Sequence, residues 1–325
     1  MALVAVPALG LVAVAGAVVV HVRQAALQRD DIREISVAFQ RADCPGAVAA
    51  FGSASHRTLL YGSRTPVPAG ALDQVEQCGE LDKARDLADD GKPAEAVAAY
   101  LQYLKAHRGS PLGRIVPDRL GRVLRDGDPP ITSGLCRDLA DVVAADELAP
   151  HETFPPLFTE CGLRLADGSR TVDRERARTL LGEVRRVYPT SSVADRAATA
   201  EARTRVSLGA EKGTMTSPYR VEGVSTLASV RYVNHTPWPA VLAVSGTKVG
   251  RVVELPGCEK CGLYDETSNG PTDCESDGAE AVTLDLQPGS YRVAVQYVGD
   301  NAPPDNSGRW TLSRGKYAEC YYGIK

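Results

Sequence analysis

The residues best suited to chemistry are four cysteines in the last third of the chain, Cys258, Cys261, Cys274 and Cys320. Cys258 and Cys261 form a Cys-x-x-Cys, a spacing that lowers the pKa of one thiol and lets the second resolve a mixed disulfide. The same spacing makes one knuckle of a zinc site, because thiolates are preferred Zn²⁺ ligands. The third interpretation is two structural disulfides that hold the 258–274 loop to the last strand.

The surroundings of these cysteines favour the disulfides. A redox Cys-x-x-Cys normally opens a helix after a strand, whereas this one follows Leu255-Pro256-Gly257 in a loop of a strand-rich region. Cys274 and Cys320 form no second zinc knuckle, and an oxidising compartment disfavours free thiolates. We therefore predict no metal and no cofactor; if zinc bound after all, these four cysteines would be its ligands. The pairing stays open, since four cysteines allow three connectivities.

The other four cysteines fall into two neighbouring pairs. Cys44 and Cys78 bracket a turn-rich stretch, and closing that loop would stabilise the fold by roughly 3–4 kcal/mol. Cys136 and Cys161 each lie beside Leu-rich helical sequence, and we expect them to pair with each other. Eight cysteines, an even number, indicate folding where thiols oxidise.

Signatures of enzymes are absent from the sequence. It has no Gly-x-Ser-x-Gly, no phosphate-binding Walker loop, no Gly-x-Gly-x-x-Gly and no His-Glu-x-x-His. Its five histidines are scattered without the spacing of metal ligands on a helix. The net charge of −4 argues against nucleic acid, because phosphate binding needs a basic face. We predict a protein that is not an enzyme and has no nucleic-acid partner.

Four aromatic residues near the C-terminus suggest a second kind of site. Trp238, Trp310, Tyr321 and Tyr322 could form a platform on which a sugar stacks. Aromatic residues on alternating strands also serve as core and cross-strand packing. The sequence alone does not decide between a sugar-binding platform and core packing.

The first 22 residues are expected to form a membrane anchor. Ala2 to Val22 contains no Asp, Glu, Lys or Arg, and as a helix it would span about 31 Å, close to the hydrocarbon thickness of a bilayer. A cleaved signal peptide is the main alternative, because Ala13-Val14-Ala15 fits a small-x-small cleavage pattern; a buried soluble helix is the other. Arg23, Arg29 and Arg33 follow the run and would keep the rest of the chain in the cytoplasm, whereas the cysteines favour the outside. We expect a single-pass bacterial membrane protein with its bulk outside.

Helical spacing dominates from residue 23 to residue 207. Residues 23–79 are predicted to form an amphipathic helix and a disulfide-closed segment, and residues 80–207 a helical domain. Within the latter, two apolar stripes flank a turn at Gly91. The residues expected to pack this hairpin are Ala84, Leu87, Gly91, Ala96, Tyr100 and Leu104.

This hairpin resembles the second half of a tetratricopeptide repeat, in which a Gly turn precedes a small Ala and then an aromatic residue. Arg108 stands where that family usually has Pro, and its Trp and Leu-Gly signals are missing. A second stretch, residues 177–204, resembles the junction between such repeats. The resemblance implies helical hairpins and either a concave surface that binds a peptide or protein, or a helical spacer.

After a linker at 208–217, alternation replaces helical spacing over residues 218–325. We predict hairpins joined at Gln287-Pro288-Gly289-Ser290 and at Arg314-Gly315, within about seven short strands. Seven strands in a region of this size resemble an immunoglobulin-like antiparallel β-sandwich.

The sequence thus predicts an α-then-β multidomain protein: an N-terminal transmembrane helix, a tetratricopeptide-like helical domain and a disulfide-pinned sandwich. The arrangement resembles an actinobacterial-type membrane-anchored envelope protein. We expect a non-catalytic scaffold that engages a protein partner at the cell envelope. A cell-wall glycan-binding module and a thiol redox protein using Cys258 and Cys261 are the alternatives.

Overall fold

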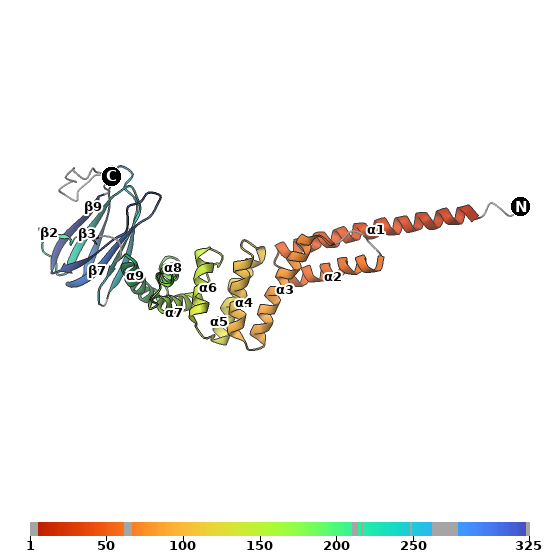
Figure 1. Ribbon diagram of the computed structural model, residues 1–325, viewed down its shortest axis with the longest axis horizontal. Coiled ribbons are helices and arrows are strands. Elements are labelled where there is room, and N and C mark those ends of the chain that lie inside the picture. Colours follow the sequence, from red (N-terminus) through yellow and green to blue (C-terminus); the bar gives the residue numbers. More distant parts are fainter. Residues whose placement is uncertain are drawn as a thin grey trace. The chain divides into compact units, whose positions relative to one another are not determined.

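The computed structural model describes residues 6–61, 67–209, 214–215, 217–247, 249–261 and 279–322. Within these, the side chains of residues 6–21, 24, 57–61, 214, 321 and 322 lie outside the description. Helices come first and strands follow, which confirms the α-then-β order (Figure 1). The chain forms two compact units, Met1–Pro130 with Asp141–Phe154, and Ile131–Ala140 with Pro155–Lys325.

The first unit is helical. Its elements are α1 (Val6–Gln40), α2 (Cys44–Tyr61), α3 (Ala69–Asp89), α4 (Pro93–Ala106), the 3-10 helix η1 (Pro111–Ile115) and α5 (Val116–Gly127). Cys44 and Cys78 lie at disulfide distance, with their Cα atoms 5.3 Å apart, and so tie α2 to α3. Among the side chains described, no helix is long and apolar enough to cross a membrane. The anchor expected over residues 1–22 lies, except for Val22, outside these described side chains.

The α3–α4 hairpin buries the side chains that its two apolar stripes bring together. Ala84, Ala96, Tyr100 and Leu104 are each at most 1% exposed. Leu87 is half-buried instead. Gly91 takes a φ of +72° in the turn between the helices, a conformation that costs little without a Cβ. Pro93 then begins α4. The first N–H groups of a helix have no acceptor within the helix, so a proline, which lacks this group, breaks no hydrogen bond there.

The second unit begins with further helices, α6 (Ser133–Ala144, whose last turn belongs to the first unit), α7 (Phe154–Ala166), α8 (Thr171–Val187) and α9 (Ala194–Gly209). Cys136 and Cys161 lie at disulfide distance, with 5.0 Å between their Cα atoms. Arg137 donates two hydrogen bonds to the buried Asp173, at 2.9 and 3.1 Å. That bonding holds the pKa of Asp173 below its usual range.

Nine described strands complete the second unit (Figure 1): β1 (Thr214–Met215), β2 (Tyr219–Val221), β3 (Ala228–His235), β4 (Ala240–Ser245), β5 (Gly250–Leu255), β6 (Glu280–Leu286), β7 (Gly289–Tyr297), β8 (Asn306–Leu312) and β9 (Gly315–Tyr322). They make a five-stranded sheet in the order β1-β8-β7-β4-β5 and a four-stranded sheet in the order β2-β9-β3-β6. Most pairs are antiparallel, while β1–β8 and β3–β9 are parallel. One core is shared by inward-facing residues of both sheets, including Tyr232, Val293 and Trp310.

Both predicted hairpins are wrong in their pairing. The turn at 287–290 connects β6 to β7, yet β6 pairs with β3 while β7 pairs with β4 and β8. The turn at Arg314-Gly315 likewise connects β8 to β9 in the other sheet. Alternation shows that one face of a strand is buried, and it does not show which strand lies beside it.

The last helix, α9, packs on the outer face of the five-stranded sheet. Val206 of α9 forms a buried cluster with Ala243 of β4 and Ala294 of β7. Gly250 of β5 lies so close that a Cβ there would come within 2.6 Å of the Thr199 Cα. Residues 210–213 and 216 of the expected linker lie outside the described residues.

The cysteines of the sandwich differ from the expected arrangement. Cys258 and Cys261 are joined to each other, with a Cα–Cα distance of 5.3 Å, so this bridge closes a turn and does not pin the loop to the last strand. The turn is held by a hydrogen bond from the Cys261 N–H to the Cys258 carbonyl at 3.1 Å. Cys320 is also disulfide-bonded, and Cys274 lies outside the described residues. Within the described part of the chain, no group of three or more His, Cys, Asp or Glu could hold a metal ion.

Candidate functional site

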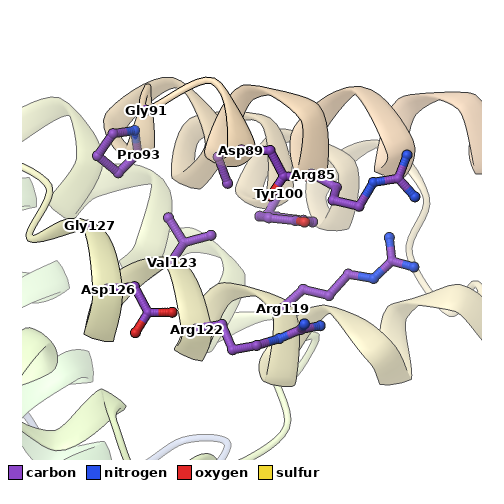
Figure 2. A pocket seen from close by; sticks show the side chains of 11 residues that line it. Arg85, Asp89, Gly91, Pro93, Tyr100, Arg119, Arg122, Val123, Asp126 and Gly127 are labelled. Carbon is purple, nitrogen blue, oxygen red and sulfur yellow. The ribbon is translucent and has the colours of Figure 1, made fainter.

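A cavity of about 650 Å³ opens in the first unit between α3, the start of α4, and α5 (Figure 2). Its walls carry three arginines and two aspartates. The lining residues are Arg85, Ala88, Asp89, Gly91, Pro93, Tyr100, Arg119, Arg122, Val123, Asp126 and Gly127.

Helical spacing brings the residues of each wall to one face. Arg119, Arg122, Val123 and Asp126 of α5 are three or four residues apart and therefore lie above one another on the helix. The opposite side of α5 is packed closely, because a Cβ at Gly121 would overlap the ring of His151. This packing fixes which face of α5 is left for the cavity.

The buried Tyr100 lines the cavity, and the charges of three arginines act on the pKa of its hydroxyl. Burial raises the pKa of the Tyr100 hydroxyl above its ordinary value. The charge of Arg119 and its hydrogen bond to that hydroxyl act in the opposite direction, followed by the charges of Arg122 and Arg85. Figure 2 shows Arg85 of α3 and Arg119 of α5 extending toward the same end of the cavity, while Asp126, Gly91 and Pro93 lie toward the other end.

The three arginines are not equally available. Arg85 is held by Asp82 and Asp86, each at 2.9 Å, and the pKa of Arg85 is raised mainly by its hydrogen bond to Asp86. Among the described residues, Arg119 has a long hydrogen bond to the Leu81 carbonyl at 3.5 Å and its contact with Tyr100, and Arg122 is exposed. No salt bridge found among the described residues of this unit involves Arg119 or Arg122. Two positive charges therefore face the cavity without a bound carboxylate.

Sequence reasoning found only part of this site. Of the residues expected to pack the hairpin, Gly91 and Tyr100 line the cavity. Ala84, Ala96 and Leu104 are buried and the half-buried Leu87 does not line it either. Arg119 and Arg122 were missed. Their signal was present, since Pro117 opens a short helix on which Arg119, Arg122 and Asp126 share a face.

The expected sugar platform is not formed by Trp310. Its side chain is fully buried in the sandwich core, so it cannot stack on a ligand. Trp238 is half-buried and donates its indole N–H to the Asp300 carbonyl at 3.3 Å. The side chains of Tyr321 and Tyr322 lie outside the described residues.

A charged cluster in the second unit joins α8 and α9 to the sheet. The fully buried carboxylate of Glu201 accepts from Arg185 at 2.9 Å and from Arg205 at 2.8 Å. Arg185 also reaches Glu254 of β5 at 2.6 Å, and this hydrogen bond lowers the pKa of Glu254. Arg205 donates to Gln296 of β7, and burial lowers the pKa of Arg205. Because every charge has a partner, this cluster serves structure.

No family model and no curated protein match the chain. A solved structure found to be similar is the Pseudomonas fluorescens alkylpurine DNA glycosylase AlkC bound to DNA containing an abasic site analog. It shares 11% sequence identity over 89% of this chain and 97% of its own, with a TM-score of 0.22.

The similar structure is an enzyme bound to DNA, and its TM-score of 0.22 carries no argument about the activity or partners of this chain. No comparison supports the expected non-catalytic scaffold with a protein partner, the expected absence of enzymatic activity, or the expected absence of a nucleic-acid partner. We carry none of these forward, nor the glycan-binding and thiol redox alternatives. A TM-score of 0.22 identifies no shared fold, so the glycosylase activity is not transferred to this chain either.

Proposed function

We propose that the helical unit binds a small acidic ligand in the cavity between α3, α4 and α5. The observation that carries the proposal is the pair Arg119 and Arg122, which face a cavity of about 650 Å³ beside the buried Tyr100 hydroxyl without an ion pair among the described residues. Guanidinium groups recognise carboxylates and phosphates through paired, charge-assisted hydrogen bonds. A cavity of this size suits a small organic molecule, for which roughly 300–1,000 Å³ is usual.

The architecture that would hold this ligand is of the tetratricopeptide type. Ala96 and Tyr100 occupy the small and aromatic positions of such a hairpin, and both are at most 1% exposed. The small residue lets α3 and α4 approach, and Tyr100 fills the gap above it, where its hydroxyl meets Arg119. We likewise propose that the two-sheet domain is immunoglobulin-like in architecture, which implies no activity.

Binding should weaken when either arginine of the cavity on α5 is replaced. Replacing either Arg119 or Arg122 by Gln removes charge-assisted hydrogen bonds of about 1.5–3 kcal/mol, so affinity should fall roughly 10- to 100-fold. We would measure binding of citrate and inorganic phosphate to the full chain by calorimetry at constant ionic strength.

Arg125→Gln is the matched control for these variants. Arg125 lies on the same helix outside the cavity lining and pairs with Glu152 at 3.3 Å, so its loss removes the same charge from α5. Equal affinities in Arg122→Gln, Arg125→Gln and the wild type would show that the cavity does not recognise anions.

We further propose that the chain folds outside the reducing cytoplasm. Three cysteine pairs at disulfide distance support this placement, because such pairs persist in oxidising compartments. Labelling of intact cells with a membrane-impermeant thiol reagent should give signal only after an impermeant reductant is added. Thiols that react only after lysis, without reductant, would place the chain inside.

A further inference from the structure

Three arginines from different elements meet at one cavity of the second unit. Arg203 comes from α9, Arg292 from β7 and Arg309 from β8, and all three are exposed. The cavity measures about 350 Å³. Its remaining lining is neutral and rich in hydroxyl groups: Ser245, Gly246, Thr247, Ser290 and Tyr291.

The strand register places two of these positively charged side chains directly opposite each other on neighbouring strands. Arg292 and Arg309 are direct partners across β7 and β8, and Ser245 of β4 is the partner of Arg292 on its other side. Their neighbours Val293 and Trp310 point into the sandwich core, so the arginines lie on the outer face, which α9 partly covers. Like charges directly opposite one another on adjacent strands destabilise a sheet unless something neutralises them.

Three described carboxylates of α9 and the five-stranded sheet region bind other partners. Glu201 holds Arg185 and Arg205, Glu254 holds Arg185, and Asp305 accepts from Gln296 at 3.3 Å. No salt bridge found in the described part of the second unit involves Arg203, Arg292 or Arg309. The cavity therefore concentrates three positive charges without a described counter-charge.

Two of the lining residues, Gly246 and Tyr291, pack closely against each other. A Cβ at Gly246 would come within 2.6 Å of the Tyr291 ring, so only glycine lets the loop after β4 approach that ring. The Tyr291 hydroxyl is turned away and donates to the Gln287 carbonyl at 2.6 Å. The hydroxyls of Ser245, Thr247 and Ser290 are then the neutral donors beside the three arginines.

We propose that this cavity binds a tetrahedral oxyanion of the phosphate class, either free or as a monoester. The guanidinium groups of Arg292, Arg309 and Arg203 can together bind an anion of charge −2. The serine and threonine hydroxyls can donate hydrogen bonds to its remaining oxygens. The proposal does not depend on the helical cavity, which lies in the other unit and is formed by other arginines.

The test compares phosphate binding and thermal unfolding of the full chain and of Arg309→Gln. In sodium chloride the variant should unfold at the same temperature as the wild type or higher, because a like-charge pair is removed. In sodium phosphate of equal ionic strength the wild type should gain stability while the variant gains none. Its affinity for radiolabelled phosphate should fall at least tenfold.

Control variants and a second ligand sharpen the result. Arg251→Gln removes an exposed arginine from the edge strand β5 outside the cavity and should respond to phosphate like the wild type. Arg292→Gln repeats the test from the opposing strand if Arg309→Gln does not fold. Glycerol phosphate, run beside inorganic phosphate, distinguishes a monoester from the free ion. A wild type that does not respond to either ligand, or an Arg309→Gln response equal to that of Arg251→Gln, would overturn the proposal.

Discussion

Replacing Glu201 by alanine should lower the free energy of unfolding of the second unit by about 3–5 kcal/mol, the cost of breaking a buried charged group away from its partners. Glu201 is fully buried and is the shared acceptor of Arg185 and Arg205, whose side chains are 24% and 12% exposed. Without it, the largely buried Arg205 guanidinium loses its counter-charge, and Arg185 keeps only Glu254. Urea unfolding followed by tryptophan fluorescence measures this unit, because both tryptophans lie in it.

Glu160→Ala is the control for Glu201→Ala. Glu160 pairs with Arg196 at 3.4 Å, but both side chains are well exposed, at 43% and 61%. Exposed ion pairs contribute roughly 0–1 kcal/mol, so this variant should unfold almost like the wild type. Similar losses in the two variants would mean that burial of the Glu201 cluster is not what makes it stabilising.

Trp310→Ala should also cost about 3–5 kcal/mol, the usual loss when a large aromatic residue is removed from a core. Trp310 is 0% exposed and packs with side chains of both sheets, including Tyr232 and Val293. Its removal leaves a cavity at the place where the two sheets meet. Thermal unfolding by circular dichroism, with the remaining Trp238 as a fluorescent reporter, gives the loss.

Trp238→Ala provides the comparison for Trp310→Ala, since these are the two tryptophans of the chain. Trp238 is half-buried and packs only at the margin of the core. We expect the Trp238→Ala variant to lose clearly less stability than Trp310→Ala. A larger loss of stability in Trp238→Ala than in Trp310→Ala would contradict the placement of Trp310 in the core.

Two features of the fold were readable from short-range patterns. The apolar stripes around Gly91 predicted a helical hairpin, because side chains three and four residues apart share one face of a helix. Alternation in residues 282–286 and 291–297 predicted strands, because successive side chains of a strand point to opposite faces. These patterns depend only on the geometry of the local backbone.

Long-range placement could not be read in the same way. The turn at 287–290 has the residues of a tight turn, yet it leads from one sheet to the other. The Cys-x-x-Cys closes on itself, a pairing that sequence alone could not select among the three possible connectivities. Trp310 is of a residue type that often binds sugars, yet its side chain is fully buried in the core.

The sequence by itself determined the order of helices before strands, the hairpin around Gly91 and the presence of paired cysteines. The tertiary structure alone brought Arg119 and Arg122 beside Tyr100, and set Arg292 opposite Arg309 with Arg203 beside them. The physical reason is one of range: helix and strand patterns arise from neighbouring residues, whereas a charged cavity is made by side chains that only packing and strand register bring together. The sites we propose for acidic ligands are therefore visible only in the folded protein.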